Sequence, residues 1–228
     1  MEHGSIMQQL LEENRWDKYQ PLMDRLRKSE YWPDFEYALA HLNRDALYVS
    51  SVHGEDHIER VLLHGAFCAM EDHLDHRDTE LLLNACSYHD VGRINDDLDP
   101  EHGRRSAEQL EALTGCSGED LLLMQAAVDA HSRSDRFLER TIRSYQPEDY
   151  PRALRLAQLL KDADGLDRVR LDDLDPGRLR RRASMERVDF ALYLYARYEI
   201  PMEEVEKLRN QYWSRKRQST GGSPKSKK

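Results

Sequence analysis

Residues 81–93, LLLNACSYHDVGR, contain an apolar run that ends in the adjacent pair His89 and Asp90. Residues three, four and seven apart lie on one face of an α-helix, so His89 continues the face that Leu82 and Cys86 belong to. Burying an imidazole or a carboxylate costs free energy unless the protein interior satisfies it. The stretch therefore predicts a helix with a buried apolar face whose C-terminal end directs potential metal ligands into the core.

The same arrangement recurs in four other stretches of the chain. In each, a histidine or aspartate extends the apolar face of an expected helix, and His102 does so by preceding Ser106, Leu110 and Leu113. Asp164 lies four residues after Leu160, and His131 lies three residues after Val128. The four further candidates are His57, His102, His131 and Asp164. A bound cation would satisfy all of these buried groups at once.

A ligand set of nitrogen and oxygen atoms without cysteine favours particular metal ions. Such a set suits Mn, Fe, Co, Ni or Zn, or Mg with water completing its coordination. Because Asp90 directly follows His89, its carboxylate can bridge to a second ion, and two-metal hydrolytic sites hold their ions about 3.5–4 Å apart. The sequence therefore predicts a centre of one or two divalent metal ions.

Five motifs in chain order carry a resemblance to a known family. They are HIERV (57–61), HDVGR (89–93), HGRRSA (102–107), AVDAHS (127–132) and DADGLD (162–167). With these motifs, residues 53–170 resemble the HD-domain metal-dependent phosphohydrolase superfamily. The resemblance implies a compact all-helical bundle in which a first ion and a second ion are bound. It implies first-ion ligands at His57, His89, Asp90 and Asp164, and second-ion ligands at His102 and His131.

The resemblance also implies an activity. Members of the superfamily hydrolyse phosphate esters, so we expect a phosphomonoesterase, phosphodiesterase or nucleotide hydrolase that uses a metal-activated water. The expected substrate is a small phosphorylated molecule, with a nucleotide as the first expectation. The expected catalytic residues are Asp90, which would position the water, and Arg93 and Arg133, which would contact phosphate oxygens. Arg93 stands where many members have lysine, which leaves its role open.

Two other functions fit the same residues. The order of the six candidates is also similar to that of di-iron oxygenases built on this fold, such as the myo-inositol oxygenase type. The redox state of the cofactor, not the sequence, separates hydrolysis from oxygen chemistry. A non-catalytic metal-binding or regulatory protein that keeps the helical bundle is the other alternative.

Other titratable residues near the motifs are weaker candidates. His53 lies one turn before the HIERV motif, and we expect it to support a ligand or lie on the surface. His64 is not expected to bind metal. Asp162 and Asp167 are expected to orient ligands or cap the helix, and Lys161 is expected to face the cavity. The candidates for the acid that protonates the leaving group are His102, His131 and Asp99.

The composition limits the partners that the protein can have. The 228 residues include 34 Lys and Arg against 43 Asp and Glu, a net charge of −9, which argues against a nucleic-acid partner. We interpret RLRRR (178–182) as surface ion-pair partners of DDLD (172–175), since no aromatic residues are interleaved for base stacking. No apolar run approaches the roughly 20 residues that span a bilayer. With no secretory signal and no disulfide pattern among Cys68, Cys86 and Cys116, a cytoplasmic protein without a membrane partner is expected.

Helical periodicity covers most of the chain, and strand-like alternation is absent, so an all-α fold is expected. The expected regions are N-terminal helices (1–52) that cover the core or form a homodimer contact, an HD-domain core (53–170), C-terminal helices (171–216) and a disordered basic tail (217–228). After one or two helices within 5–28, helices are expected near 33–51, 54–73, 78–90, 100–113, 118–131, 148–164, 184–198 and 201–216. Ser117 with Asp120 is expected to cap the helix at 118–131.

Overall fold

The structure, a computed structural model, describes residues 5–199, and within this range every regular element is a helix. The all-α fold class is therefore confirmed. The expected helix at 201–216 and the basic tail lie outside the described residues. The α-helices are α1 (Ile6–Glu13), α2 (Gln20–Arg27), α3 (Trp32–Ala40), α4 (Glu55–Glu71), α5 (His76–Tyr88), α6 (His102–Ala107), α7 (Leu110–Thr114), α8 (Gly118–His131), α9 (Leu138–Ser144), α10 (Tyr150–Leu166), α11 (Arg182–Glu186) and α12 (Val188–Glu199).

Helix α4 lies at the centre of the bundle and is buried on all sides. Every residue from His57 to Met70 is buried, although the sequence indicated a single apolar face. The N-terminal helices cover the face of α4 that carries Glu59. There, the amide of Met7 in α1 and the side chain of Arg44 both donate to Glu59. The N-terminal helices therefore pack on α4, and a homodimer contact through them stays a prediction.

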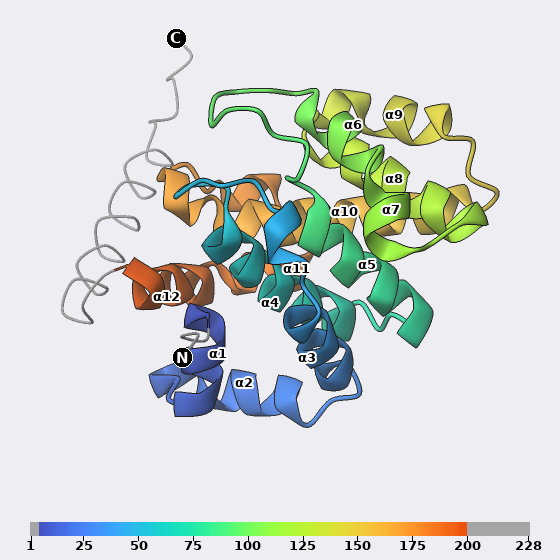
Figure 1. Cartoon of the computed structure of the whole chain (residues 1–228). Helices are drawn as coiled ribbons and strands as arrows, with labels where there is room; N and C mark the ends of the chain where they lie inside the picture. The colour runs from blue at the N-terminus through green and yellow to red at the C-terminus, as the bar shows by residue number, and fades with distance from the viewer. Residues whose placement is uncertain (1–4, 200–228) are drawn as a thin grey trace, which may run out of the picture.

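Helices α5 and α10 pack against α4, helix α8 packs against α5 and α10, and these three helices supply most of the remaining core. Helix α10 lies against α4, α5 and α8, and α6 lies against α8. Figure 1 shows α1–α3 gathered on one side of the molecule and α6–α9 on another, with α4, α5 and α10 between them. This arrangement places the start of α4 and the ends of α5, α8 and α10 near one another.

Several helix boundaries differ from the expectation. The helix expected at 33–51 ends at Ala40, because the amide of Asn43 donates to Tyr88 and Arg44 binds carboxylates of α4, which hold the following residues in a turn. The segments expected as single helices at 100–113 and 184–198 are each divided in two, and α9 was not expected. Ser117 makes no capping hydrogen bond, since Gly118 adopts a left-handed conformation with φ of 61° directly after it.

Two glycines allow α6 to approach the core closely. A Cβ atom on Gly92 would lie 2.4 Å from the amide nitrogen of Ser106 and 2.6 Å from the carbonyl oxygen of His102. A Cβ atom on Gly103 would lie 2.6 Å from the carbonyl oxygen of Val128 in α8. These approaches are possible only without a side chain, and they place the first turn of α6 against both the loop after α5 and the end of α8.

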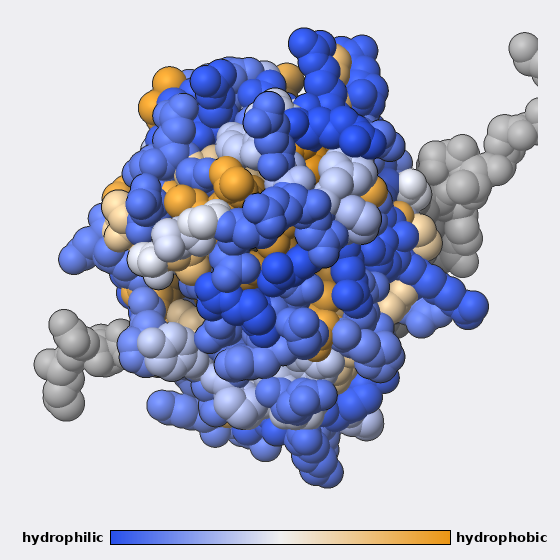
Figure 2. Space-filling view, turned by 90° about the vertical axis from the view of Figure 1, so that its right-hand side faces the viewer, coloured by the Kyte–Doolittle hydropathy of each residue, from blue (hydrophilic) through white to orange (hydrophobic). Residues whose placement is uncertain are grey.

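The surface is mainly hydrophilic on the face that Figure 2 shows, where hydrophobic residues occur in small separate patches. This agrees with a content of charged residues of 34%. Among residues 5–199, none of the helices has the length and apolarity that crossing a bilayer requires.

Candidate metal centre

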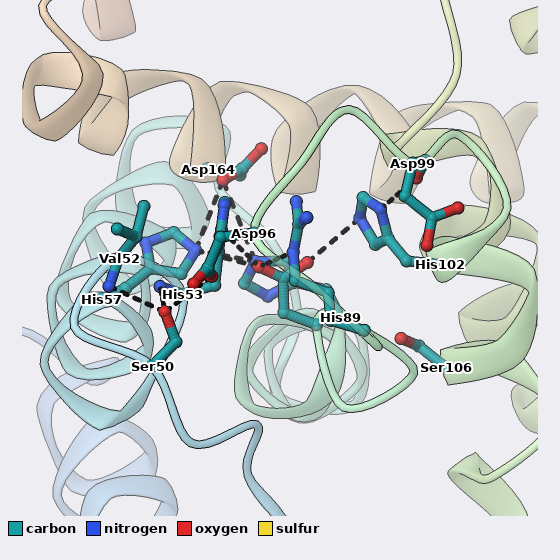
Figure 3. Close-up of polar contacts among 12 residues, drawn as sticks. Ser50, Val52, His53, His57, His89, Asp96, Asp99, His102, Ser106 and Asp164 are labelled. Carbon is teal, nitrogen blue, oxygen red and sulfur yellow. Dashed lines mark hydrogen bonds and ion pairs between the residues drawn. The ribbon is translucent and has the colours of Figure 1, made fainter.

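The six side chains predicted as metal ligands lie together where five helix ends meet. They are His57 in the first turn of α4, His89 and Asp90 directly after α5, His102 at the start of α6, His131 at the end of α8 and Asp164 near the end of α10. Figure 3 shows His57, His89 and Asp164 around one point, with His102 to one side. All six are buried except Asp164, whose side chain keeps 20% exposure. Their role as ligands stays a prediction, but the structure brings all of them to one place.

Asp90 lies between two groups of these side chains. We call His57, His89 and Asp164 the His57 group, and His102 with His131 the His102 group. Asp90 Oδ2 lies 3.6 Å from His57 Nε2, whereas Oδ1 lies 3.0 Å from His102 Nε2 and 3.6 Å from His131 Nε2. One carboxylate oxygen thus faces each group, which is the arrangement expected of a ligand shared by two ions.

Within the His57 group, the potential ligand atoms are close enough to share one ion. His57 Nε2 lies 3.1 Å from His89 Nε2 and 3.5 Å from Asp164 Oδ1. The distance from His89 Nε2 to Asp164 Oδ1 is 3.8 Å. Three overlapping trios that could hold a cation have their ligand atoms within 4.8 Å of one another. They are His53, His57 and Asp90; His57, His89 and Asp164; and His89, Asp90 and His131.

The second ring nitrogen of each candidate histidine fixes its tautomer. Nδ1 of His89, His102 and His131 contacts the backbone carbonyl oxygen of the residue three positions earlier. Nδ1 of His57 lies 2.7 Å from a carboxylate oxygen of Asp167. Because these oxygens only accept hydrogen bonds, Nδ1 carries the proton in all four rings. Nε2 therefore presents a lone pair toward the centre, the form in which histidine binds metal.

This arrangement leaves the facing Nε2 atoms and Asp90 Oδ1 without a hydrogen-bond donor. The facing Nε2 atoms of His57 and His89 are 3.1 Å apart, and those of His102 and His131 are 2.9 Å apart. Two lone pairs at such distances repel each other unless a proton or a cation lies near both. Asp90 Oδ1 is buried and makes no hydrogen bond with any described residue. The donor set therefore fits divalent cations.

The protonation states of the cluster also suit a cation, because metal ligands must be deprotonated. Burial, with a smaller contribution from the charge of Arg170, lowers the pKa of His57 to about 3. Burial likewise lowers the pKa of His131 to about 4, although Asp90 opposes this shift. Burial alone would raise the pKa of Asp90, but the adjacent histidines, His89 foremost, hold that pKa well below its usual range.

Asp167 orients His57, as predicted. The carboxylate accepts a hydrogen bond from His57 Nδ1 and binds the guanidinium of Arg60 through contacts of 2.6 and 3.0 Å. Both carboxylate oxygens are fully buried. Asp162, by contrast, neither orients a ligand nor caps its own helix, since it accepts from the backbone amides of Arg180 and Arg181.

Two further residues, His53 and Arg170, define the surroundings of the centre. His53 is buried, with Nδ1 3.1 Å from Asp90 Oδ2, so it supports the centre and does not lie on the surface. Sequence reasoning missed Arg170, whose Nη2 lies 3.1 Å from His53 Nδ1 and 3.9 Å from Asp164 Oδ1. Its only sequence signal is its position three residues after Asp167.

The two arginines predicted to bind phosphate have different surroundings. Arg93 Nε lies 2.9 Å from Asp90 Oδ2, and its buried Nη1 has no hydrogen-bond partner among the described residues. Arg133 instead binds Asp129 at 2.8 Å and Glu101 at 3.0 Å. Arg93 thus has a donor left for a ligand, whereas the donors of Arg133 are largely occupied.

Asp99 is the weakest of the three candidates for the leaving-group acid. Despite the opposing effect of burial, its hydrogen bond from Arg105 holds the pKa of Asp99 below the usual range, so the carboxyl group is ionised near neutral pH. Its backbone carbonyl oxygen contacts His102 Nδ1. We infer that Asp99 orients His102 and does not supply a proton.

A cavity of about 560 Å³ lies beside the centre. His131 and Asp164 belong to its lining, together with Arg133 and Lys161. Lys161 therefore borders the cavity as expected, although its ammonium group donates to three carbonyl oxygens at the end of α8. The cavity therefore borders the centre at His131 and Asp164.

The comparisons with known proteins concern the same region. The HD domain family matches residues 54–169, just over half of the 228 residues, and this region contains all six candidate ligands. Neither a search of curated proteins nor a search of solved structures found a match. The resemblance noted from the motifs is thereby confirmed, and the buried histidine and aspartate clusters agree with it. The chain belongs to the HD domain family.

Proposed function

We propose that the protein is a metal-dependent phosphohydrolase that cleaves a phosphate ester of a small molecule. The observation that carries the proposal is the set of four Nε2 lone pairs directed at the two oxygens of one buried aspartate, Asp90. A buried set of acceptors without a donor is costly, and divalent cations would remove that cost. Membership of the HD domain family supports the hydrolytic use of such a centre.

The protein would use its own residues to bind and orient the reactants. Divalent ions held at the centre would supply Lewis acidity, which lowers the pKa of water and polarises phosphate oxygens. Asp90, facing both groups, would position the attacking water. Arg93 Nη1 has an unused donor for a phosphate oxygen, while its Nε contact keeps the guanidinium beside Asp90. Because the centre is buried, these electrostatic interactions are stronger than they would be in bulk water.

The first experiment is a phosphatase screen of the purified protein with Mn, Mg, Co and Ni, together with metal analysis. The variant Asp90→Asn keeps the size of the side chain and removes the charge that both groups face. We expect kcat to fall roughly 10³-fold or more, because stabilisation by the metal contributes several kcal/mol, and we expect bound metal to be lost.

Asp162→Asn is the matched control, since Asp162 is equally buried but binds the backbone amides of Arg180 and Arg181 and the guanidinium of Arg180 instead of a candidate metal ligand. An Asp90→Asn protein with unchanged activity and metal content would refute the proposal. Aerobically purified protein with a mixed-valent di-iron signal would instead support the oxygenase, and a protein with neither metal nor activity would support a regulatory role.

A further inference from the structure

Five cationic side chains line the cavity beside the metal centre. They are Arg133, Lys161, Arg168, Arg178 and Arg180. Because His131 and Asp164 line the same cavity, a substrate whose phosphate reached the centre would have the rest of its structure near these cations. Which of the five are available to a substrate depends on the acceptors that each already has.

Three of the five cations are held by several acceptors of the protein. Lys161 donates to three backbone carbonyl oxygens at 2.7–3.1 Å. Arg180 is held by two carboxylates, with contacts of 2.5 and 3.1 Å, and Arg133 by two others, at 2.8 and 3.0 Å. These three side chains have a structural role, because a ligand would have to displace several bonds from each.

The other two cations are more exposed, and within residues 5–199 each pairs with one carboxylate. Arg168, with 39% of its side chain exposed, contacts Asp173, which is itself 48% exposed. Arg178, 79% exposed, has its Nε 3.8 Å from Asp175. Exposed ion pairs contribute little to stability, whereas an arginine and a phosphate or carboxylate form strong, often bidentate, hydrogen bonds. Both arginines can therefore exchange their partner for an anionic ligand.

We propose that Arg168 and Arg178 form a second anion-binding subsite, and that the substrate carries a second anionic group besides the phosphate that is hydrolysed. The inference rests on the proposed phosphohydrolase function. The second group is a phosphate or a carboxylate, since both share the geometry that arginine recognises. Of RLRRR, interpreted from the sequence as surface ion pairs, Arg178 then has a role in binding substrate.

The same cavity gives little support for recognition of a nucleobase. Among the described residues that line it, none is phenylalanine, tyrosine or tryptophan, the side chains on which bases commonly stack. Its lining instead combines arginine, lysine and aspartate with few apolar residues. A sugar or short-chain bisphosphate, or a phosphorylated carboxylic acid, therefore fits the lining better than a nucleoside monophosphate does.

The test compares substrates that differ in the second anionic group, with the metal-loaded protein. Fructose 1,6-bisphosphate is compared with fructose 1-phosphate, fructose 6-phosphate and AMP, and p-nitrophenyl phosphate reports on the metal centre alone. We expect kcat/KM for the bisphosphate to exceed that for the monophosphates by roughly tenfold or more. The double variant Arg168→Gln/Arg178→Gln should lower that value by roughly 10- to 100-fold, mainly through KM, and change p-nitrophenyl phosphate hydrolysis by less than about twofold.

Arg182→Gln is the matched control, because Arg182 is a 92% exposed arginine of the same segment that pairs with Glu186 outside this cavity. It should leave all the substrates unaffected. Equal kcat/KM for bisphosphate and monophosphates, or a loss in the double variant that is equal on all substrates, would overturn the subsite alone. Absence of hydrolysis of every ester with every metal would overturn the phosphohydrolase function and the subsite with it.

Discussion

His57 and the other three histidines of the centre are oriented by different means. His57 Nδ1 donates to the carboxylate of Asp167, 110 residues away in the chain. Nδ1 of His89, His102 and His131 instead donates to a backbone carbonyl oxygen three residues earlier. One histidine therefore depends on the tertiary packing of α4 against α10, and the other three depend on the local geometry of a helix end.

The difference has consequences for metal binding. A carboxylate partner makes the histidine a stronger ligand than a neutral carbonyl does and fixes the direction of its ring. It also places a charge in the core, which Arg60 compensates through contacts of 2.6 and 3.0 Å. Locally oriented histidines need no such compensation, but their rings meet only if the helix ends approach closely. We therefore expect the His57 group to be sensitive to charge and the His102 group to be sensitive to packing.

Among the substitutions that test this comparison, Gly103→Ala is expected to have the largest effect, and it tests the sensitivity of the His102 group to packing. The added Cβ atom would lie 2.6 Å from the carbonyl oxygen of Val128 and 2.6 Å from Ser132 Oγ. Moving the backbone atoms of α8 aside would cost much free energy, so α6 should instead move away from α8 and separate His102 from His131. We expect the metal content to fall from two ions to one and kcat to fall by about 10²- to 10³-fold, as measured by elemental analysis and phosphatase kinetics.

Gly177→Ala is the control for this substitution, since its Cβ atom would meet only Asp175 Oδ1 at 3.4 Å, an ordinary contact. It should retain both ions. If Gly103→Ala also retained both ions and full activity, the close approach of α6 and α8 would not determine metal binding by the His102 group. The expected sensitivity of that group to packing would then be refuted.

A smaller effect is expected for Asp167→Asn, which tests the sensitivity of the His57 group to charge. Asparagine can still accept the hydrogen bond from His57, but the group loses its negative charge. We expect metal affinity to fall about 10- to 100-fold while both ions still bind at high concentration, as measured by titration calorimetry. Asp162→Asn changes a buried carboxylate of α10 that binds backbone amides and Arg180 instead of a histidine, and it should leave the affinity unchanged. Equal losses in the two variants would indicate general destabilisation and not a role for the charge.

The sequence predicted the centre better than its surroundings. Helical periodicity places each candidate ligand on an apolar face, and buried faces of one bundle must meet, so the gathering of the six side chains followed from local pattern. The role of Asp167 was predictable because DADGLD puts it three residues after Asp164. Contacts between distant segments carry no such signal. The cover that α1 forms over α4, the position of Arg170 beside His53, and the pairing of Arg168 with Asp173 became apparent only in the structure.

His64 offers a second comparison on the same helix. It lies two turns after His57 on α4 and is also fully buried, but neither of its ring nitrogens has a hydrogen-bond partner among the described residues. Its ring packs edge-on against Phe190 at a centroid distance of 6.1 Å. Burial lowers the pKa of His64 to about 3, the same value as for His57, although only His57 faces the centre. Of these two histidines, only His57 should therefore affect metal binding, whereas both should affect the stability of the protein in acid.

The smallest effect is expected for His64→Leu, measured as the pH dependence of the free energy of unfolding of the metal-free protein. In the unfolded chain histidine titrates near pH 6.5, so between about pH 6.5 and 3 the unfolded state binds a proton that the folded state excludes. The free energy of unfolding therefore decreases as the pH decreases through this window, by up to about 1.4 kcal/mol per pH unit for each such histidine. Above about pH 6.5 these histidines do not affect it. Leucine removes one of these titrations, so urea unfolding at pH 7 and pH 5 should show a shallower loss for the variant. An unchanged pH dependence would mean that His64 takes up its proton without unfolding, and that burial alone does not keep a histidine of α4 neutral.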